Sequence, residues 1–127
     1  MLDTDTVSWA LRGQGAVAAR LLEHRPSQLC ISVITLAELR FGADAKGSRR
    51  LHGLIDTFTA TVEVMPVDRG TADRFGRVAT ALSKRGEPIG TFDTLIAAHA
   101  LSLGVTLVTN NAKHFRRVAG LKTANWV

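Results

Sequence analysis

The chain has 127 residues, 46% of them hydrophobic, and no apolar run approaches the roughly 18–20 residues that cross a bilayer. These values predict one globular domain over residues 1–127 and argue against a disordered chain and a membrane partner. Cys30 is the only cysteine, which excludes an internal disulfide, and 16 Lys and Arg against 11 Asp and Glu give a net charge of +5. This basic balance favours partners that bear phosphate.

The N-terminal segment, MLDTDTVSWALRG, places acids where a secretory signal peptide needs basic residues. We therefore expect no export and a cytoplasmic protein. The apolar residues of this segment predict a helix that begins near Thr4 or Asp5, with a Thr or Asp as its cap. Gly13 and Gly15 are expected to end it.

The rest of the chain alternates between helical and extended patterns. Helices are predicted over residues 16–23, 35–43, 51–58 and 68–84, from Asp93 to Gly104, and in a short turn after Asn111. Short buried strands are predicted over 29–32, 62–65 and 105–108, with a strand or tail over 121–127. Strands that alternate with helices indicate an α/β domain of three layers, with a short central parallel sheet flanked by helices.

The helix from Asp93 to Gly104 is apolar almost all round, as expected for a buried helix. Asp93 is its one carboxylate and lies in the first turn, on the same face as Ile96, Ala97 and Ala100. Two interpretations are open. Asp93 complements the positive end of its helix, or it lines a polar pocket where helix starts and strand ends meet.

Other polar residues fall at the expected carboxyl edge of the sheet, where sites form in open parallel sheets. Asp3 ends a very short first strand, Glu38 lies on the helix that leaves residues 29–32, and Asn111 follows residues 105–108. Converging carboxylates repel one another, and Mg²⁺ or Mn²⁺, which prefer carboxylate oxygens, would relieve this repulsion. Spacing alone also allows Asp3 to be a helix cap, Glu38 a surface residue and Asn111 a turn residue.

Several other kinds of site lack their motifs. The sequence contains no P-loop, no G-x-G-x-x-G and no G-x-S-x-G, and its histidines have no zinc-ligand spacing with Cys30. His99 is expected to be a satisfied core histidine and His114 a surface residue. The five Phe and two Trp are scattered, so the pattern predicts no aromatic platform for stacking bases.

Four segments together resemble the PIN-domain ribonucleases, and most of all the VapC toxins of bacterial VapBC toxin–antitoxin pairs. They read LDTD, ITLAELRFGA, PIGTFDTLIAAHAL and LVTNNAKHF, and the resemblance covers essentially the whole chain. It implies a Mg²⁺-dependent (Mn²⁺ is an alternative) endoribonuclease toxin that cleaves structured RNA such as tRNA or rRNA. It also implies inhibition by a VapB-like antitoxin and a homodimer.

Carried over by motif, Asp3, Glu38 and Asp93 match the acids of the family. The resemblance implies that Asp3 and Asp93 hold the metal and that Glu38 completes the cluster directly or through water. The chain departs at the fourth acid, where Asn111 and His114 stand. Asn111 can still ligate or orient a water through its amide oxygen, so it is kept as a catalytic candidate.

Two rival functions remain at this point. Asp3-Thr4-Asp5-Thr6-Val7 fits the D-x-D-x-[TV] loop of haloacid-dehalogenase-like phosphatases, in which Asp3 would be the nucleophile and Asp5 the acid/base. That fold also needs a paired-acid motif, and no adjacent acids follow Asp5. The second rival is a catalytically weak RNA-binding or interaction module, suggested by the missing fourth acid.

Overall fold

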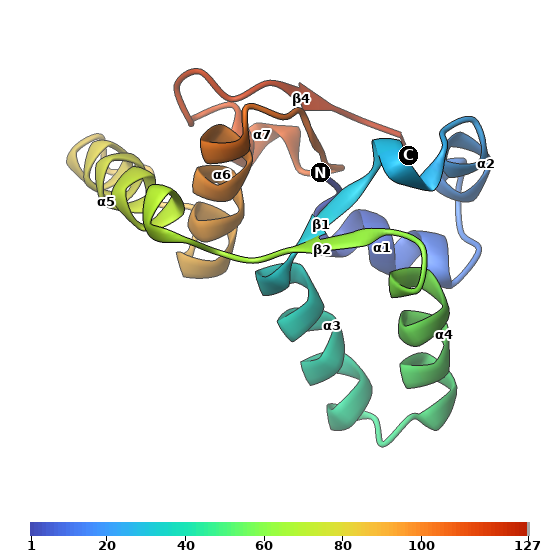
Figure 1. Ribbon diagram of the computed structural model, residues 1–127. Helices are drawn as coiled ribbons and strands as arrows, with labels where there is room; N and C mark the ends of the chain where they lie inside the picture. Colours follow the sequence, from blue (N-terminus) through green and yellow to red (C-terminus); the bar gives the residue numbers. More distant parts are fainter. Residues whose placement is uncertain (127) are drawn as a thin grey trace.

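The computed structural model describes residues 1–126, in which short strands alternate with helices (Figure 1). The elements of the first half are α1 (Thr4–Leu11), α2 (Val17–Leu22), a 3₁₀ turn (Pro26–Gln28), β1 (Cys30–Ser32), α3 (Val33–Ala45) and α4 (Arg49–Thr59). Those of the second half are β2 (Glu63–Met65), α5 (Arg69–Lys84), α6 (Thr91–Leu103), β3 (Leu107–Val108), α7 (Ala112–Phe115) and β4 (Thr123–Ala124).

The strands form a short parallel sheet whose centre is the N-terminal segment. β1 pairs with β2 and β3 pairs with β4, both in parallel. Leu2 joins the two pairs through parallel bridges to Ile31 and Val108. The predicted first strand is therefore reduced to one bridging residue, and Asp3 follows it directly. The α/β fold with a parallel sheet flanked by helices is confirmed.

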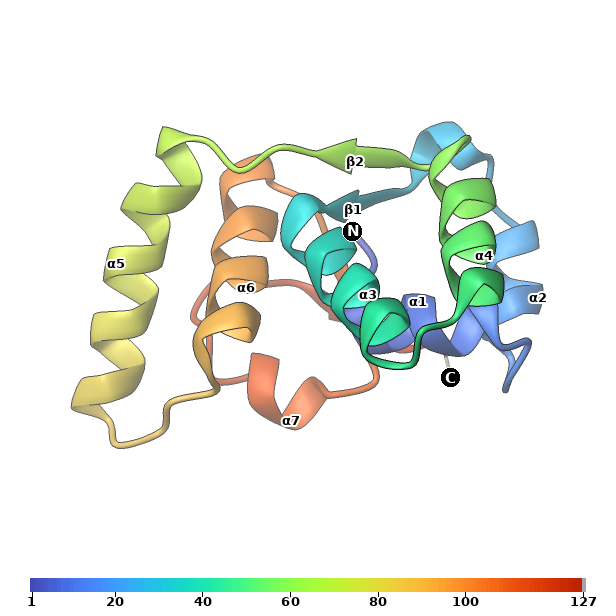
Figure 2. The ribbon, with the colours of Figure 1, turned by 90° about the horizontal axis from the view of Figure 1, so that it is seen from below.

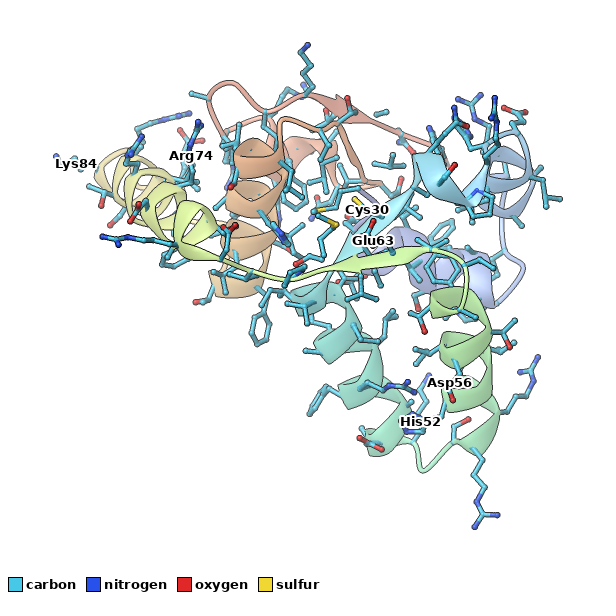
Figure 3. The ribbon with its side chains drawn as sticks, in the orientation of Figure 1. Cys30, His52, Asp56, Glu63, Arg74 and Lys84 are labelled. Atoms are coloured by element: carbon cyan, nitrogen blue, oxygen red, sulfur yellow. The ribbon has the colours of Figure 1, made fainter. Side chains whose placement is uncertain are left out.

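The helices are arranged in two pairs beside the sheet. Figures 1 and 2 show α5 packed along α6, and α3 and α4 as a hairpin that projects on the other side. Arg40 on α3 holds this hairpin together because it forms an ion pair with Asp56 and lies 2.8 Å from His52 Nδ1. Figure 3 shows His52 and Asp56 between the two helices. This network fixes the helix that also carries Glu38.

The starts of four helices are set by side-chain caps. Asp3, Ser32, Ser48 and Asp68 each accept a hydrogen bond from a backbone N–H in the first turn of α1, α3, α4 and α5, respectively. Because Ser32 is the cap of α3, this helix begins at Val33, two residues before the predicted start at residue 35. None of the described helices is long and apolar enough to cross a bilayer.

The end of α6 explains why the next strand is shorter than predicted. Gly104 adopts the left-handed conformation, with φ 67°, which glycine allows at little cost. The N–H of Val105 then bonds back to the carbonyl of Ala100 at 3.1 Å, so Val105 belongs to the helix cap. β3 consequently covers Leu107–Val108 and not 105–108. Of the predicted terminal strand, Thr123–Ala124 is extended, and residue 127 lies outside the described residues.

α6 is buried as its sequence predicts, with Ile96, Ala97 and Ala100 inaccessible to solvent in the core. His99 on this helix is also buried, and its Nδ1 lies 2.8 Å from Ser32 Oγ. Burial lowers the pKa of His99, and a hydrogen bond with the backbone of Pro66 acts against this fall. His99 is therefore a buried core histidine with polar partners, as predicted.

Candidate active site

The polar residues expected at the sheet edge lie together. Asp3, Glu38, Asp93 and Asn111 line one cavity of about 220 Å³, together with Thr4, Asp5 and Phe115. Each predicted residue reaches the cavity from a different element. Asp3 precedes α1, Glu38 lies in the middle of α3, Asp93 in the first turn of α6, and Asn111 at the start of α7.

Asp3 is both a helix cap and a residue of the cavity wall, the two roles that its spacing in the sequence allows. Its Oδ1 accepts a hydrogen bond from the backbone N–H of Thr6 at 2.9 Å, so it caps α1. The side chain also lines the cavity, although the residue is only 4% exposed. Burial raises the pKa of Asp3, and hydrogen bonds with Thr109 and Thr6 act against this rise. The helix cap therefore holds the carboxylate at the cavity wall.

Asp93 lies among other negatively charged side chains. Burial, followed by the charges of Glu38, Asp3 and Asp5, raises its pKa from 3.8 to about 6. The partner that offsets this rise is His114, whose Nδ1 lies 4.0 Å from Asp93 Oδ2. Among residues 1–126, no Lys or Arg forms an ion pair with Asp3, Glu38 or Asp93. The interpretation of Asp93 as a mere helix-end charge does not account for these neighbours.

The donor set of the cavity fits a hard divalent cation. The carboxylates of the cavity supply negatively charged oxygen atoms, and Mg²⁺ and Mn²⁺ prefer such ligands. No group of three or more His, Cys, Asp or Glu side chains in the described part of the chain is arranged as a ready ligand cage. The oxygen donors that line the cavity suit Mg²⁺ better than Zn²⁺, because Zn²⁺ sites are built mostly from Cys and His.

Thr4 is a site residue that the spacing of acids does not reveal. Its hydroxyl donates a hydrogen bond to Glu38 Oε1 at 2.6 Å and lies 3.3 Å from Thr35 Oγ1. The bond connects the start of α1 to the middle of α3, and so it orients Glu38 within the cavity. The feature of the sequence that could have indicated Thr4 as a site residue is its position next to Asp3 in the segment LDTD.

His114 is also closer to the site than its expected surface position suggests. Its side chain is 42% exposed, and its Nδ1 lies 2.9 Å from Asn111 Nδ2. Because the amide nitrogen of Asn111 is engaged with this ring, its amide oxygen is the atom left for a ligand or a water. Asn111 and His114 therefore act as a linked pair on the side of the cavity formed by α7.

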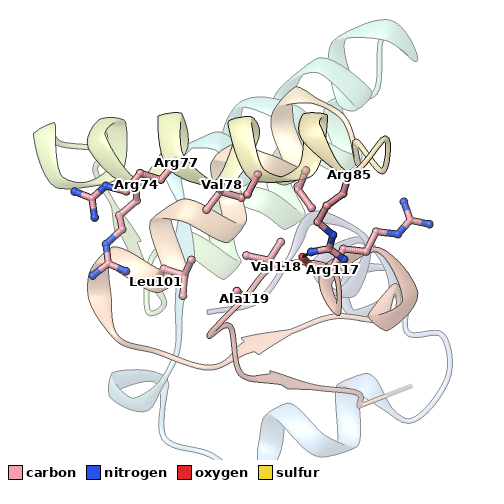
Figure 4. Close-up of a pocket in the computed structure, with 10 residues that line it drawn as sticks. Arg74, Arg77, Val78, Arg85, Leu101, Arg117, Val118 and Ala119 are labelled. Atoms are coloured by element: carbon pink, nitrogen blue, oxygen red, sulfur yellow. Dashed lines mark hydrogen bonds between the residues drawn. The ribbon is translucent and has the colours of Figure 1, made fainter.

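A second cavity of about 200 Å³ lies away from the acids, between α5 and the segment that follows α7 (Figure 4). Its rim carries Arg74, Arg77, Arg85 and Arg117, and its floor is apolar. Glu87 forms ion pairs with Arg85 at 3.6 Å and with Arg117 at 3.3 Å. No carboxylate among residues 1–126 lines this cavity. It therefore offers positive charge but no acid, base or metal ligand of its own.

Comparison with known proteins points to one family. The PIN domain family matches residues 1–121. The chain is 35% identical to the tRNA(fMet)-specific endonuclease VapC of Shigella flexneri, over 99% of this chain and 96% of that protein. It is 36% identical to ribonuclease VapC2 of Haemophilus influenzae, over 100% of this chain and 97% of that protein.

Solved structures agree with this assignment. The chain superposes with a TM-score of 0.93 on a chain of DNA-bound VapBC from Salmonella typhimurium, at 33% identity and with 100% of this chain and 97% of that chain covered. The TM-score is 0.91 for VapBC2 from Rickettsia felis bound to a promoter DNA fragment, at 32% identity and with 100% and 98% covered. The protein therefore belongs to the PIN-domain family, among the VapC ribonucleases.

Proposed function

We infer that the chain is a metal-dependent endoribonuclease in which Asp3, Glu38, Asp93 and Asn111 are the catalytic residues and Mg²⁺ or Mn²⁺ is the cofactor. The observation that carries this is that Asp3, Glu38 and Asp93 line one cavity, with Asp5 beside them, and that the pKa of Asp93 is raised to about 6 there. Without Asp3, Glu38 and Asp93, 8 of the 11 acids remain against 16 Lys and Arg. An acidic cavity in an otherwise basic chain suits the cleavage of a polyanion.

Each side chain has a role that follows from its position. When bound, the metal ion polarises a phosphodiester and lowers the pKa of a water. Asp3 and Asp93 would hold the ion, and Glu38, held by the Thr4 hydroxyl, would accept the proton of the attacking water. The amide oxygen of Asn111 orients that water.

Phosphates that flank the cleaved bond need cations beside the acids. Arg12 and Lys46 line a neighbouring cavity that shares Thr4 and Glu38 with the acidic one. They are the side chains that we assign to these phosphates. Glu38 lines both cavities. An RNA whose phosphodiester lies in the acidic cavity therefore has its neighbouring phosphates close to Arg12 and Lys46.

The substrate and partners follow the named relatives. Since one relative is named a tRNA(fMet)-specific endonuclease, we assign structured RNA to this chain, with initiator tRNA as the first candidate. Several similar structures are VapBC toxin–antitoxin complexes, and a VapB-like antitoxin is the partner that we assign here. The active form is a homodimer, and the protein acts in the cytoplasm, where the tRNA resides.

Cleavage of an initiator tRNA transcript in the presence of Mg²⁺ tests the catalytic assignment. Wild-type protein is expected to cut the RNA, and chelation of the metal or Asp93→Asn is expected to abolish cutting. Asp73→Asn is the matched control, because Asp73 is an exposed acid on α5 away from the cavity. Circular dichroism checks that both variants remain folded. Binding of RNA without cleavage across a broad RNA panel, with Mg²⁺ or Mn²⁺, would establish the non-catalytic alternative instead.

Growth after induced expression tests the toxin assignment. Production of the chain alone is expected to arrest growth, and co-production of a VapB-like antitoxin encoded beside it is expected to restore growth. Asp3→Asn and Asp93→Asn should remove the arrest. Harmless expression of a wild-type protein that cuts RNA in the test tube would overturn the toxin role and leave the nuclease activity intact.

A further inference from the structure

Two exposed phenylalanines stand beside the acidic cavity. Phe41 is 77% exposed and Phe92 is 56% exposed. Within residues 1–126, the exposed large hydrophobic side chains are Leu22, Val33, Phe41 and Phe92, and the last two are the aromatic ones. Together with Thr4, Ala37 and Glu38, the two rings line a cavity of about 470 Å³. Large apolar surface left in water at one place marks a binding site.

The two rings are fixed to the catalytic elements. Phe41 lies three residues after Glu38 on α3, a spacing that places both on one face of the helix. Phe92 directly precedes Asp93 in the first turn of α6. Thr4 and Glu38 line both the acidic cavity and the aromatic one. The aromatic cavity is therefore continuous with the site of cleavage.

This continuity determines which occupant fits. The acids are suited to a phosphodiester, and the neighbouring wall offers planar apolar faces with little polar surface. A nucleotide fits both cavities, because it carries a phosphate and a planar base in one unit. Single-stranded RNA is bound in this way, with unstacked bases placed against aromatic side chains. The net charge of +5 also favours RNA, because the phosphates of RNA carry negative charge.

We propose that Phe41 and Phe92 form a stacking site for an unpaired nucleobase next to the cleaved phosphodiester. The proposal rests on the ribonuclease function inferred above, and it adds the substrate feature that the enzyme selects. A base held between these rings must leave its own helix stack, so cleavage is directed to loops and other unpaired segments. The scattered aromatics of the sequence did not predict this site, because Phe41 and Phe92 are far apart along the chain and line one cavity only in the fold.

RNA binding to a non-cleaving protein tests the proposal. In the Asp93→Asn background, the probes are short unpaired oligoribonucleotides with a single 2-aminopurine or a single abasic residue, moved through every position. Stacking should quench 2-aminopurine fluorescence at one position. Phe41→Ala with Phe92→Ala should remove this quenching and weaken binding by about 5- to 100-fold. Phe41→Trp should retain both signals, and Phe41→Leu should lose the quenching.

A chemical double-mutant cycle sharpens the test. An abasic residue at the quenched position should weaken binding to the Asp93→Asn protein, and it should have little further effect once both phenylalanines are alanine. Leu22→Ala is the matched control, because Leu22 is 88% exposed on α2 and lines neither cavity. In the cleaving protein, the two alanines should raise KM more than they lower kcat.

Two results would overturn the proposal. The first is an abasic penalty of equal size with and without the phenylalanine rings. The second is unchanged RNA affinity together with a changed oligomeric state by light scattering, which would assign the rings to an interface with a second copy. Both are read in the non-cleaving protein. They are thus separate from the failure of wild-type protein to cut RNA, which would contradict the proposed function itself.

Discussion

Asp93 places a carboxylate at the start of a buried apolar helix, among other acids. The raised pKa means that the folded chain holds a proton on Asp93 more tightly than the unfolded chain does. Stability of the metal-free protein is therefore expected to fall as pH rises from about 3.8 to about 6, and to stay reduced above that window. The site thus costs the metal-free protein part of its stability.

Asp93→Asn should accordingly stabilise the metal-free protein at pH 7. The side chain is 35% exposed, so the shift must be discounted for solvent screening, and the expected gain is about 1–2 kcal/mol, or a few degrees in Tm. The gain should shrink as pH falls toward 3.8 and vanish below that value, because Asp93 is then protonated in both states. Thermal unfolding in EDTA between pH 3 and 7.5 measures this. A variant less stable than wild type at pH 7 would contradict the raised pKa.

Asn111→Asp should add an acid to the cavity wall at the start of α7. An additional anionic oxygen should lower the Mg²⁺ concentration needed for half-maximal cleavage by about 3- to 10-fold, by the general preference of Mg²⁺ for carboxylates. The same charge should lower the stability of the metal-free protein, because it raises the pKa of Asp93 further. Mg²⁺ titrations of cleavage and melting curves in EDTA check both effects. An unchanged Mg²⁺ requirement would place Asn111 outside the metal site.

The sequence predicted which acids meet, since strand ends and helix starts share one edge of a parallel sheet. It did not predict the contact between Thr4 and Glu38 or the pairing of Asn111 with His114. Such bonds depend on side-chain rotamers and on the packing of α1 against α3, neither of which a spacing pattern contains.

At the scale of elements, Ser32 joins β1, α3 and α6. Its hydroxyl oxygen accepts a hydrogen bond from Ile34 N–H at 3.1 Å, and it lies 2.8 Å from His99 Nδ1. If Ser32 donates its proton to this nitrogen, both bonds are satisfied by one hydroxyl group. The end of a central strand is thereby tied to the starting turn of one helix and to the middle of another.

Ser32→Ala should therefore cost more than the loss of a cap. We expect about 2–3 kcal/mol of unfolding free energy, because the cap of α3 and the partner of a buried His99 are lost together. Ser48→Ala is the matched control, since Ser48 caps α4 by one bond to Leu51 N–H at 3.1 Å and should cost about 1 kcal/mol. Urea unfolding compares the two. Equal costs would show that the bond to His99 contributes nothing.

The helices were easier to predict than the strands for a physical reason. A helix is specified by local periodicity and by caps such as Asp68, whereas β3 is two residues long and is extended because it pairs with Met1, Leu2 and β4. Strand limits therefore depend on partners that are distant in the sequence. Val105 is β-branched and was predicted to be in a strand, but its N–H bonds to the end of α6 and so it belongs to the helix cap.

At the scale of the whole molecule, cationic side chains line two cavities other than the acidic one. The arginines of the cavity in Figure 4, together with Arg12 and Lys46, present cations on several sides of the protein. RNA binding should release counterions from the phosphates that these side chains neutralise. The affinity for RNA should therefore depend on these surface cations as well as on the acidic cavity.

RNA affinity should consequently fall by about 10- to 100-fold between 50 and 200 mM salt, as expected for about four phosphate contacts. Fluorescence anisotropy of labelled RNA with the Asp93→Asn protein measures the slope. Replacing Arg12 and Lys46 with alanine should make the slope shallower, and replacing the exposed Arg25 should leave it unchanged. A slope near zero in the Asp93→Asn protein would contradict an electrostatic surface for RNA.

The position of the exposed turn at Gly47, between α3 and α4, has a practical consequence. A cut there leaves Asp3 and Glu38 on one polypeptide and Asp93 and Asn111 on the other. The two pieces share the pairing of β1 with β2 and the bridge between Leu2 and Val108. Fused to proteins that associate on command, they would form a split nuclease, in which RNA cleavage reports that two otherwise inactive halves have met.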